Sequence, residues 1–476
     1  MTHPPRNLGV FLLSMLVFSF ITGLGNAPAL AESGLHAVFF LVMAAVGVLA
    51  PVALVSAELA SGWPRAGGIY LWVSEAFGPR TGFVAMWFVW VSALVGYPGL
   101  FAFLVAAAVY VVAPGLDDST WFLGSVGIGV GWLATVFTFL GIRATGIITT
   151  IANVLAVFVP AVGLIVLGAV YFGRGLPTQV DITAGGFVPD FGSVAGLSIA
   201  VSAYFTFAGG ENAAQYITAV RSPQRTYPRA MFVGAGLCLV VFIPVTIIMV
   251  ATVPRNELSL AVGVLQVIEV LLDSVSLGVL LPLFAAVLTI GACAGLPNLL
   301  AATAAGMHAA ARDGHLPERF DRTNRRGVPV VLLVLQAGVA TIVSIAFFAV
   351  QNVNVAFWVI TVMGLQTTLV YYLLMYGAVL RLRRTQPDTP RPFRVPGGSV
   401  GIWIVAGGGL VLALATLALS FVPPSQLEDI HPLVFDGMLA SVIVATAISG
   451  LVVSRRSRPS PDTPVRTSEA GAPAGP

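Results

Sequence analysis

A carboxylate lies inside an apolar stretch of the chain, directly after two glycines. Glu211 follows Gly209 and Gly210 in residues 192–219, a segment long and apolar enough to cross a bilayer. A glycine pair weakens a helix, and backbone groups freed inside a membrane are tolerated only where protein buries them or a watery cavity solvates them. A carboxylate near mid-membrane costs about 3 kcal/mol on insertion scales. The pattern predicts a broken helix and a binding site at Glu211; a packing kink near the interface is the simpler alternative.

The first apolar stretch, residues 8–33, carries a similar interruption. Its small, polar and helix-breaking region contains Thr22, Gly23, Leu24, Gly25, Asn26 and Pro28. Interrupted segments in corresponding positions of two halves are typical of inverted-repeat transporters and indicate where the ligand binds. The competing interpretation is that glycine is common in membrane helices, and this chain has 51 glycines.

Residues typical of enzyme and metal sites are sparse. Cys238 and Cys293 both lie in apolar segments, which excludes a disulfide framework and any site with several cysteine ligands. The five histidines are scattered without ligand spacing, and the sequence contains no P-loop, HExxH or GxSxG motif. We therefore predict no catalytic residue, no metal, no cofactor and no enzymatic activity.

The composition indicates a membrane protein with many spans. Of 476 residues, 57% are hydrophobic and 9% are charged, and the mean hydropathy is +0.95. All 23 basic residues are arginines, placed in short loops and not on one basic face, so nucleic acid is not an expected partner. The expected partners are the lipid bilayer and a small solute.

Twelve stretches are long and apolar enough to span a bilayer. They fall at about 8–33, 36–60, 82–112, 121–141, 147–172, 192–219, 230–253, 276–310, 328–349, 353–381, 400–423 and 432–453. With a cytoplasmic N-terminus, all arginines except Arg174 and Arg255 lie on the inner side, as the positive-inside rule requires. This predicts a multi-pass protein of the cell membrane with both termini in the cytoplasm. Ala29-Leu30-Ala31 resembles a signal-peptidase site, but the interrupted run before it favours an uncleaved first helix.

The spans suggest a repeated organisation. A core at 1–381 contains two sets of five spans, about 8–172 and 192–381, and an odd number per set gives the two copies opposite orientations. Two further spans at 400–453 follow. A tail at 454–476, rich in Ser, Pro, Thr and Ala, is expected to be disordered.

Several residues outside the two interruptions also have expected roles. Residues 71–77 are expected to form a short interfacial helix, and residues 257–275 an outer helix able to act as a lid. Glu58 is expected to be an interfacial or paired residue. Tyr371 and Tyr372 are polar-tipped aromatics that would either face a cavity or serve packing.

Three ordered motifs resemble signatures of the amino acid/polyamine/organocation transporter superfamily over roughly residues 8–453. They are Gly62-Trp-Pro-Arg-Ala-Gly-Gly-Ile-Tyr70, Phe207-Ala-Gly-Gly-Glu211 with Ser222-Pro223 and Tyr227-Pro-Arg-Ala230, and Arg312-Asp-Gly-His-Leu-Pro317 with Gly327-Val-Pro329. Two further stretches, Gly25 to Gly34 and Ser420 to Pro424, are similar to the glutamate/GABA antiporter branch.

The resemblance implies an all-α membrane protein of 12 transmembrane helices. Its core would be a 5+5 inverted repeat like that of the leucine transporter, with helices 1 and 6 discontinuous. Backbone amides of Thr22 to Asn26 would hold a substrate carboxylate, and carbonyls of Phe205 to Gly210 would face its ammonium group. These roles fit the charges at helix ends. Glu211 matches the family's glutamate at the helix 6 break, and Phe205 falls where related exchangers place an aromatic gate.

The resemblance also has departures that bear on function. Proton-coupled relatives carry a helix 5 lysine where this chain has Val159, and the chain has no lysine at all, which excludes that coupling device. The main hypothesis is therefore a secondary transporter that exchanges an amino acid or amine by alternating access. Two alternatives remain: symport coupled to protons through Glu211, and a sensor that binds amino acids without moving them.

Overall fold

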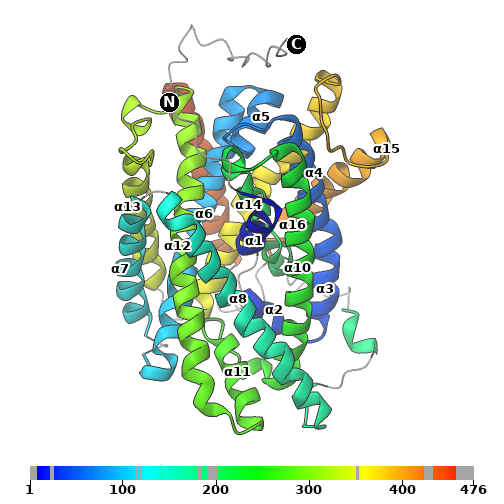
Figure 1. The fold of residues 1–476 in the computed structure, drawn as a ribbon, viewed down its shortest axis with the longest axis vertical. Helices are drawn as coiled ribbons and strands as arrows, with labels where there is room; N and C mark the ends of the chain where they lie inside the picture. The colour runs from blue at the N-terminus through cyan, green and yellow to red at the C-terminus, as the bar shows by residue number, and fades with distance from the viewer. Residues whose placement is uncertain are drawn as a thin grey trace, which may run out of the picture.

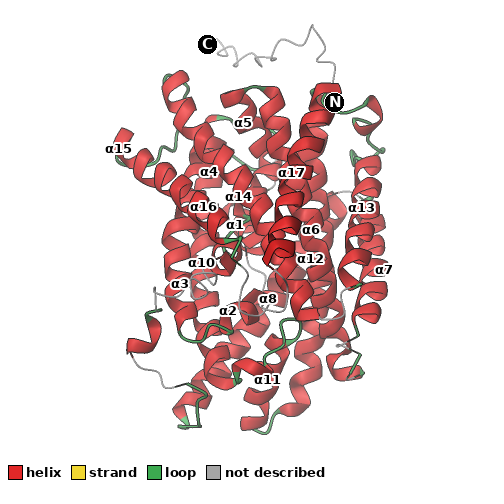
Figure 2. Cartoon of the chain, turned by 180° about the vertical axis from the view of Figure 1, so that it is seen from behind, coloured by secondary structure: helices red, strands yellow, loops and turns green. Residues whose placement is uncertain are grey.

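The protein is a bundle of helices that run along its long axis (Figures 1 and 2). The computed structural model describes residues 8–21, 26–113, 115–116, 119–140, 142–180, 184–189, 201–349, 353–422 and 432–456. Within those residues every extended element is a helix, and the only β-type pairing is an isolated parallel bridge between Leu8 and Val220. The all-helical prediction is confirmed for the described part of the chain.

The helices vary widely in length. The α-helices are α1 (Val10–Ile21), α2 (Ala27–Ala31), α3 (His36–Ala44), α4 (Ala50–Gly62), α5 (Ile69–Phe77), α6 (Pro79–Val112), α7 (Thr120–Thr138), α8 (Ile142–Gly173), α10 (Pro223–Thr252), α11 (Gly263–Ser274), α12 (Leu281–Arg312), α13 (Val330–Phe348), α14 (Val353–Thr385), α15 (Gly398–Ile402), α16 (Gly408–Leu419) and α17 (Pro432–Arg456). Two π-helical turns join neighbours, η2 (Ala45–Leu49) and η8 (Trp403–Gly407), and the 3-10 segments are η3 (Ala184–Phe187), η4 (Gly210–Ala219), η5 (Arg255–Glu257), η6 (Gly278–Leu280) and η7 (Glu318–Phe320).

Among the residues that the structure describes, ten helical segments are long and apolar enough to cross a membrane. They correspond to ten of the predicted spans. The two remaining predictions, 8–33 and 192–219, coincide with the interrupted stretches, where the described helical pieces are short. The count of twelve spans therefore stays a prediction.

The sixth predicted span is broken. Residues 201–206 are helical, the helix ends before Phe207, and η4 begins at Gly210. In the first predicted span α1 ends at Ile21 and α2 begins at Ala27, and residues 22–25 lie outside the described part of the chain. The interruption predicted beside Glu211 is thus confirmed.

Glycine is required at this break for two reasons. Gly209 has φ +107°, a backbone conformation that side chains with a Cβ rarely adopt. A Cβ added there would also lie 2.8 Å from the carbonyl oxygen of Phe20, and one at Gly210 would lie 2.9 Å from Ile21. The end of α1 therefore lies directly against the glycine pair.

The first and sixth segments pack against each other in opposite directions. Leu8, before α1, accepts a backbone hydrogen bond from Arg221 at 2.9 Å and donates one to Ala219 at 3.0 Å. At the other end of the pair, Phe20 stacks on Tyr216 of η4, and Figure 1 shows α1 in the middle of the bundle. Because the start of α1 lies beside Val220 and its end lies beside Gly209, the two segments run antiparallel overall, although the Leu8–Val220 bridge is itself parallel. This contact fits the expected inverted repeat, which stays a prediction.

Two short helices lie at opposite ends of the bundle (Figure 1). One is α5, which confirms the short helix expected at 71–77, although it begins at Ile69. The other is α11, within the predicted outer segment; it buries its apolar face, and its Glu269 accepts a hydrogen bond from the Tyr110 hydroxyl of α6. Lid movement by α11 remains a hypothesis.

The C-terminal helices cover the outside of the core. The segment 398–419 packs on α14, and α17 packs on α6, where the Trp87 indole donates to the Ser449 hydroxyl at 3.0 Å. Helix α17 continues to Arg456, so residues 454–456 of the expected disordered tail are helical. The helix thus extends past its predicted end by less than one turn, and the Ser454 hydroxyl donates to the Leu451 carbonyl within that turn. Residues 457–476 lie outside the described part of the chain.

Candidate functional site

A cavity of about 340 Å³ lies in the centre of the bundle. It is bounded by the end of α1, by the break in the sixth span, and by faces of α6, α12 and α14. Its volume is at the lower end of the range for small-molecule sites. The end of α1 and the break in the sixth span therefore meet at one partly open space suited to a small solute.

The predicted site residues fall into three groups. Those that line the cavity are Asn26, Phe205, Ala208, Gly209 and Tyr371. Those buried behind its wall are Phe207, Gly210 and Glu211. Those outside the described part of the chain are Thr22, Gly23, Leu24 and Gly25. The structure thus brings the first group together, while substrate contact by any of them stays a prediction.

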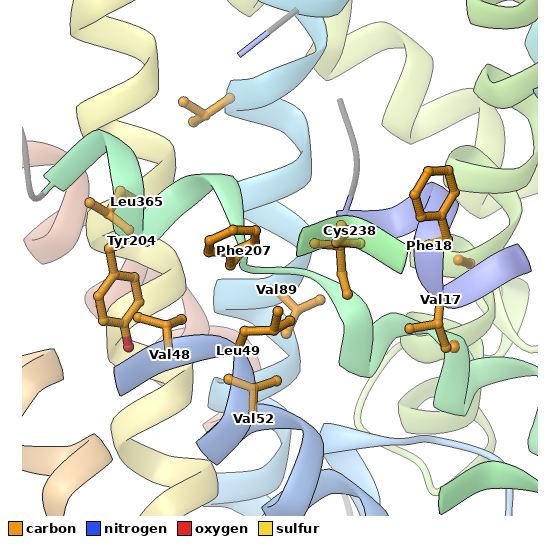
Figure 3. Close-up of a cluster of buried hydrophobic side chains, with 14 of the residues drawn as sticks. Val17, Phe18, Val48, Leu49, Val52, Val89, Tyr204, Phe207, Cys238 and Leu365 are labelled. Atoms are coloured by element: carbon orange, nitrogen blue, oxygen red, sulfur yellow. The ribbon is translucent and has the colours of Figure 1, made fainter. Parts of the chain in front are cut away.

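The Phe207 side chain does not line the cavity, whereas the predicted role of Phe207 concerned its backbone carbonyl and stays a prediction. It is fully buried and makes an edge-on contact with Phe242 of α10, with ring centroids 6.0 Å apart. Figure 3 shows it in an apolar cluster with Leu49 and Val52. Because the chain turns at Phe207, Phe205 faces the solute space and Phe207 faces the core.

The carboxylate of Glu211 points away from the cavity and towards α14. The Tyr371 hydroxyl donates to Oε1 at 3.0 Å, and the Tyr372 hydroxyl donates to Oε2 at 2.8 Å. The Gly209 backbone N–H in turn donates to the Tyr372 oxygen at 3.0 Å. Glu211 is 1% exposed, so these bonds are what satisfy it.

This arrangement gives Glu211 a defined contact with a distant helix. The carboxylate fastens the broken segment to α14, and its contact with the solute stays a prediction. Tyr371 is the link, because it both holds Glu211 and lines the cavity. No ion pair to Glu211 is found among the described residues.

One face of α14 supplies much of the cavity wall. Phe357, Ile360, Thr361, Thr368 and Tyr371 recur at helical spacing and all line the space. Of these, sequence reasoning identified only Tyr371. The signal available for the others was threonine at helical spacing in an otherwise apolar span, which is too common to single out.

A buried polar network supports the opposite wall. Gln336 of α13 accepts a hydrogen bond from the Trp90 indole at 3.2 Å and donates to the Tyr97 hydroxyl at 2.8 Å and to Thr303 at 3.2 Å. Thr303 lines the cavity. Gln336 therefore fixes the cavity wall from a helix that does not itself contact the space.

Glu58 is a paired residue, which confirms one of its two expected roles. It is fully buried near the end of α4, and Arg383 of α14 binds both carboxylate oxygens, at 2.8 and 2.6 Å. The Val395 N–H adds a bond of 2.8 Å. This cluster joins α4 to the end of α14 at the end of the bundle where α5 lies (Figure 2).

Two of the sequence motifs contact each other near that end. The Tyr70 hydroxyl, from the first motif, donates to Asp313 Oδ2 of the third motif at 2.6 Å. Burial, together with the neighbouring Asp313 charge, raises the pKa of the Tyr70 hydroxyl above its usual value. Gly68 lies beside Gln215 of η4, so the segment after the break reaches the same junction.

A family model and several relatives match most of the chain. A family model described as amino acid permease matches residues 8–448. An uncharacterized transporter of Legionella pneumophila is 32% identical over 444 residues, 93% of this chain and 96% of the relative. A glutamate/gamma-aminobutyrate antiporter of Lactococcus lactis is 31% identical over 456 residues, 94% of this chain and 90% of the relative. A putrescine transporter of Escherichia coli is 26% identical over 397 residues, 82% of this chain and 87% of the relative.

Proposed function

Because this chain belongs to the amino acid permease family, we propose that it is a secondary active transporter that exchanges an amino acid or a related amine across a membrane. One observation carries the proposal. The end of α1 and the break at Phe207 to Gly209 meet at a central cavity of about 340 Å³. Relatives named as antiporters support exchange over one-way movement.

The broken helix supplies groups that suit a zwitterion. A helix that ends before Phe207 leaves its last carbonyls without partners inside the helix, and these carry partial negative charge. We assign the ammonium group of the solute to the carbonyls of Phe205 to Gly210. The carboxylate is assigned to the backbone amides of Thr22 to Asn26, of which Asn26 lines the cavity.

The pairing of α1 with η4 supports movement by alternating access. The two segments contact each other along their length, and both pack on α10. Glu211, Tyr371 and Tyr372 provide the contact between this unit and α14. We infer that the unit rocks against the α6, α12 and α14 wall, with these hydrogen bonds rearranging between the two open states.

The arginine distribution supports a position in the cell membrane with cytoplasmic termini. Arg174 binds the Ser274 carbonyl at the end of α11, while the Glu58 and Arg383 cluster lies at the opposite end with α5. Positive charge is retained on the cytoplasmic side of membrane proteins. The arginine-rich end would therefore face the cytoplasm.

Counterflow tests the exchange mechanism. Purified protein in liposomes would take up labelled amino acids, one at a time, with and without unlabelled amino acid or amine inside. We expect internal solute to increase the initial rate. If no internal amino acid or amine increases the initial uptake rate, the proposed exchange mechanism is wrong.

Proton coupling through Glu211 is the second candidate. It is favoured by the bonding of Glu211, whose partners include the Tyr371 and Tyr372 hydroxyl groups, which could accompany either protonation state. In this version the carboxyl group binds a proton in one half of the cycle. If an imposed pH gradient does not change the uptake rate of either the wild type or Glu211→Gln, proton coupling through Glu211 is ruled out.

A further inference from the structure

The described side chains that line the cavity are all uncharged. They are aromatic, aliphatic, hydroxyl or amide groups, and the nearest carboxylate, Glu211, is buried behind Tyr371. A charged group enclosed without an opposite charge is strongly disfavoured. The break in the sixth span offers partial negative charge to one ammonium group, and no described side chain of this wall carries a charge that could balance a further one.

The threonine hydroxyl groups in the wall already donate hydrogen bonds to backbone carbonyls. Thr361 donates to the Phe357 carbonyl at 2.8 Å, Thr368 donates to the Gly364 carbonyl at 2.9 Å, and Thr303 donates to the Leu299 carbonyl at 2.7 Å. A hydroxyl has a single proton, so these groups present lone pairs to the cavity. These three hydroxyl groups therefore offer no proton to a second carboxylate on the solute, and every other described donor side chain in the wall is uncharged.

Two aromatic side chains and one aliphatic side chain form an apolar part of the cavity wall. Phe205 lies against Gly364 of α14, where an added Cβ would be 3.6 Å from its ring, and Phe357 lies against Gly99 of α6 at 3.7 Å by the same measure. Ile360 lines the space between them along the α14 face. The glycines leave room for the two rings, which both line the cavity.

We propose that the transported solute is a zwitterion with one ammonium group, one carboxylate and an uncharged, largely apolar remainder that packs between Phe205 and Phe357. This inference rests on the proposed transport function and narrows it. It separates this chain from relatives named for putrescine, which carries two ammonium groups, and for glutamate, which carries a second carboxylate.

Competition with a charge-graded panel tests the proposal. Proteoliposomes of the full chain, loaded with unlabelled leucine, would exchange labelled leucine against external leucine, 4-aminobutyrate, glutamate or putrescine. We expect half-inhibition by glutamate and by putrescine to need at least about tenfold more solute than half-inhibition by the best neutral zwitterion. Glutamate or putrescine competing as well as the neutral zwitterions would overturn the proposal.

A binding measurement separates this proposal from the transport function. The same four solutes would be added to the detergent-solubilised protein and its thermal unfolding followed. Stabilisation by neutral zwitterions alone, without counterflow, would support the charge selectivity and reject transport. If no neutral zwitterion produces either stabilisation or counterflow, both the charge selectivity and the transport function are overturned.

A charge added to the wall provides a matched test. Thr361 lies ten residues from Tyr371 along α14, about 15 Å, so a carboxylate there is remote from Glu211. We expect Thr361→Asp to lower the putrescine concentration for half-inhibition at least about tenfold, and the isosteric Thr361→Asn to leave it unchanged. The same gain in both variants would overturn the proposal. If Thr361→Asp does not fold, Asn212→Asp places the carboxylate elsewhere on the wall, and no gain of putrescine binding there would count against it.

Discussion

At the scale of single residues, two adjacent tyrosines both bind Glu211 but differ in their other contacts. Tyr371 contacts both the carboxylate and the cavity, whereas Tyr372 contacts the carboxylate and the Gly209 N–H. Both are nearly or fully buried. Their positions predict different consequences for the loss of one hydroxyl group.

Removal of the Tyr372 hydroxyl should reduce stability more than removal of the Tyr371 hydroxyl. Tyr372→Phe leaves two buried polar groups without this partner, at a cost of about 1 to 3 kcal/mol each, and Tyr371→Phe leaves one carboxylate oxygen without its donor. Thermal unfolding in detergent would measure the order. Tyr371→Phe less stable than Tyr372→Phe would contradict the bonding described here.

Glu211→Gln should slow transport at least about tenfold while keeping the fold, because a glutamine fills the same volume. Its amide nitrogen would face a tyrosine hydroxyl that donates to the native carboxylate. Initial uptake rates and thermal unfolding would be compared on the same preparation. A parallel loss of both would assign Glu211 a structural role only.

At the scale of elements, the break in the sixth span depends on close packing with α1. Gly209 has φ +107°, and the Phe20 carbonyl lies where a Cβ at this position would be. The backbone conformation and the packing contact therefore both restrict residue 209 to glycine. A helix break that is only a flexible kink would need neither. The break is therefore a built feature of the interface.

Gly209→Ala should destabilise the protein by roughly 1 to 3 kcal/mol and reduce transport. The matched control is Gly236→Ala in α10, where an added Cβ meets nothing within 4 Å and a better helix former should be neutral or stabilising. Thermal unfolding of both variants measures the difference. Equal melting temperatures for the two would show that the backbone at 209 is not restrained.

The Glu58 cluster joins two elements through buried charge. Glu58→Ala should cost about 3 to 5 kcal/mol, because Arg383 would lose the carboxylate that neutralises it. Arg65→Ala removes the more exposed pair with Glu75 and should cost no more than about 1 kcal/mol. Denaturation by heat at low and high salt would compare them. A larger effect at Arg65 would contradict this ranking.

At the scale of the whole molecule, the two ends of the bundle differ in charge and in loop structure. One end has α5 and the Glu58 cluster, and the other has α11 with Arg174. The proposed orientation places the first end in the cytoplasm. The accessibility of the loops to a reagent outside the cell tests this orientation.

Cysteine labelling in intact cells should reach Thr178→Cys and miss Asp388→Cys. Both native positions are exposed in loops at opposite ends, and the background would carry Cys238→Ala and Cys293→Ala. A membrane-impermeant maleimide should label the second variant only after permeabilisation. The reverse pattern would invert the proposed topology.

The sequence by itself determined the class of the protein, ten of its membrane helices and the break at Gly209 and Gly210. These features are local: a bilayer requires long apolar runs, and a glycine pair before a carboxylate weakens any helix in place. The family resemblance, carried by three motifs, was also confirmed.

The tertiary structure alone decided which of these residues face the solute. Phe205 and Phe207 are two residues apart, yet one lines the cavity and the other packs against Phe242. Glu211 is bonded to tyrosines some 160 residues later in the chain. The packing of distant helices decides which side chains face the cavity and which residues bond to each other. No local sequence pattern encodes this, because the same types of apolar residue face lipid, core and cavity.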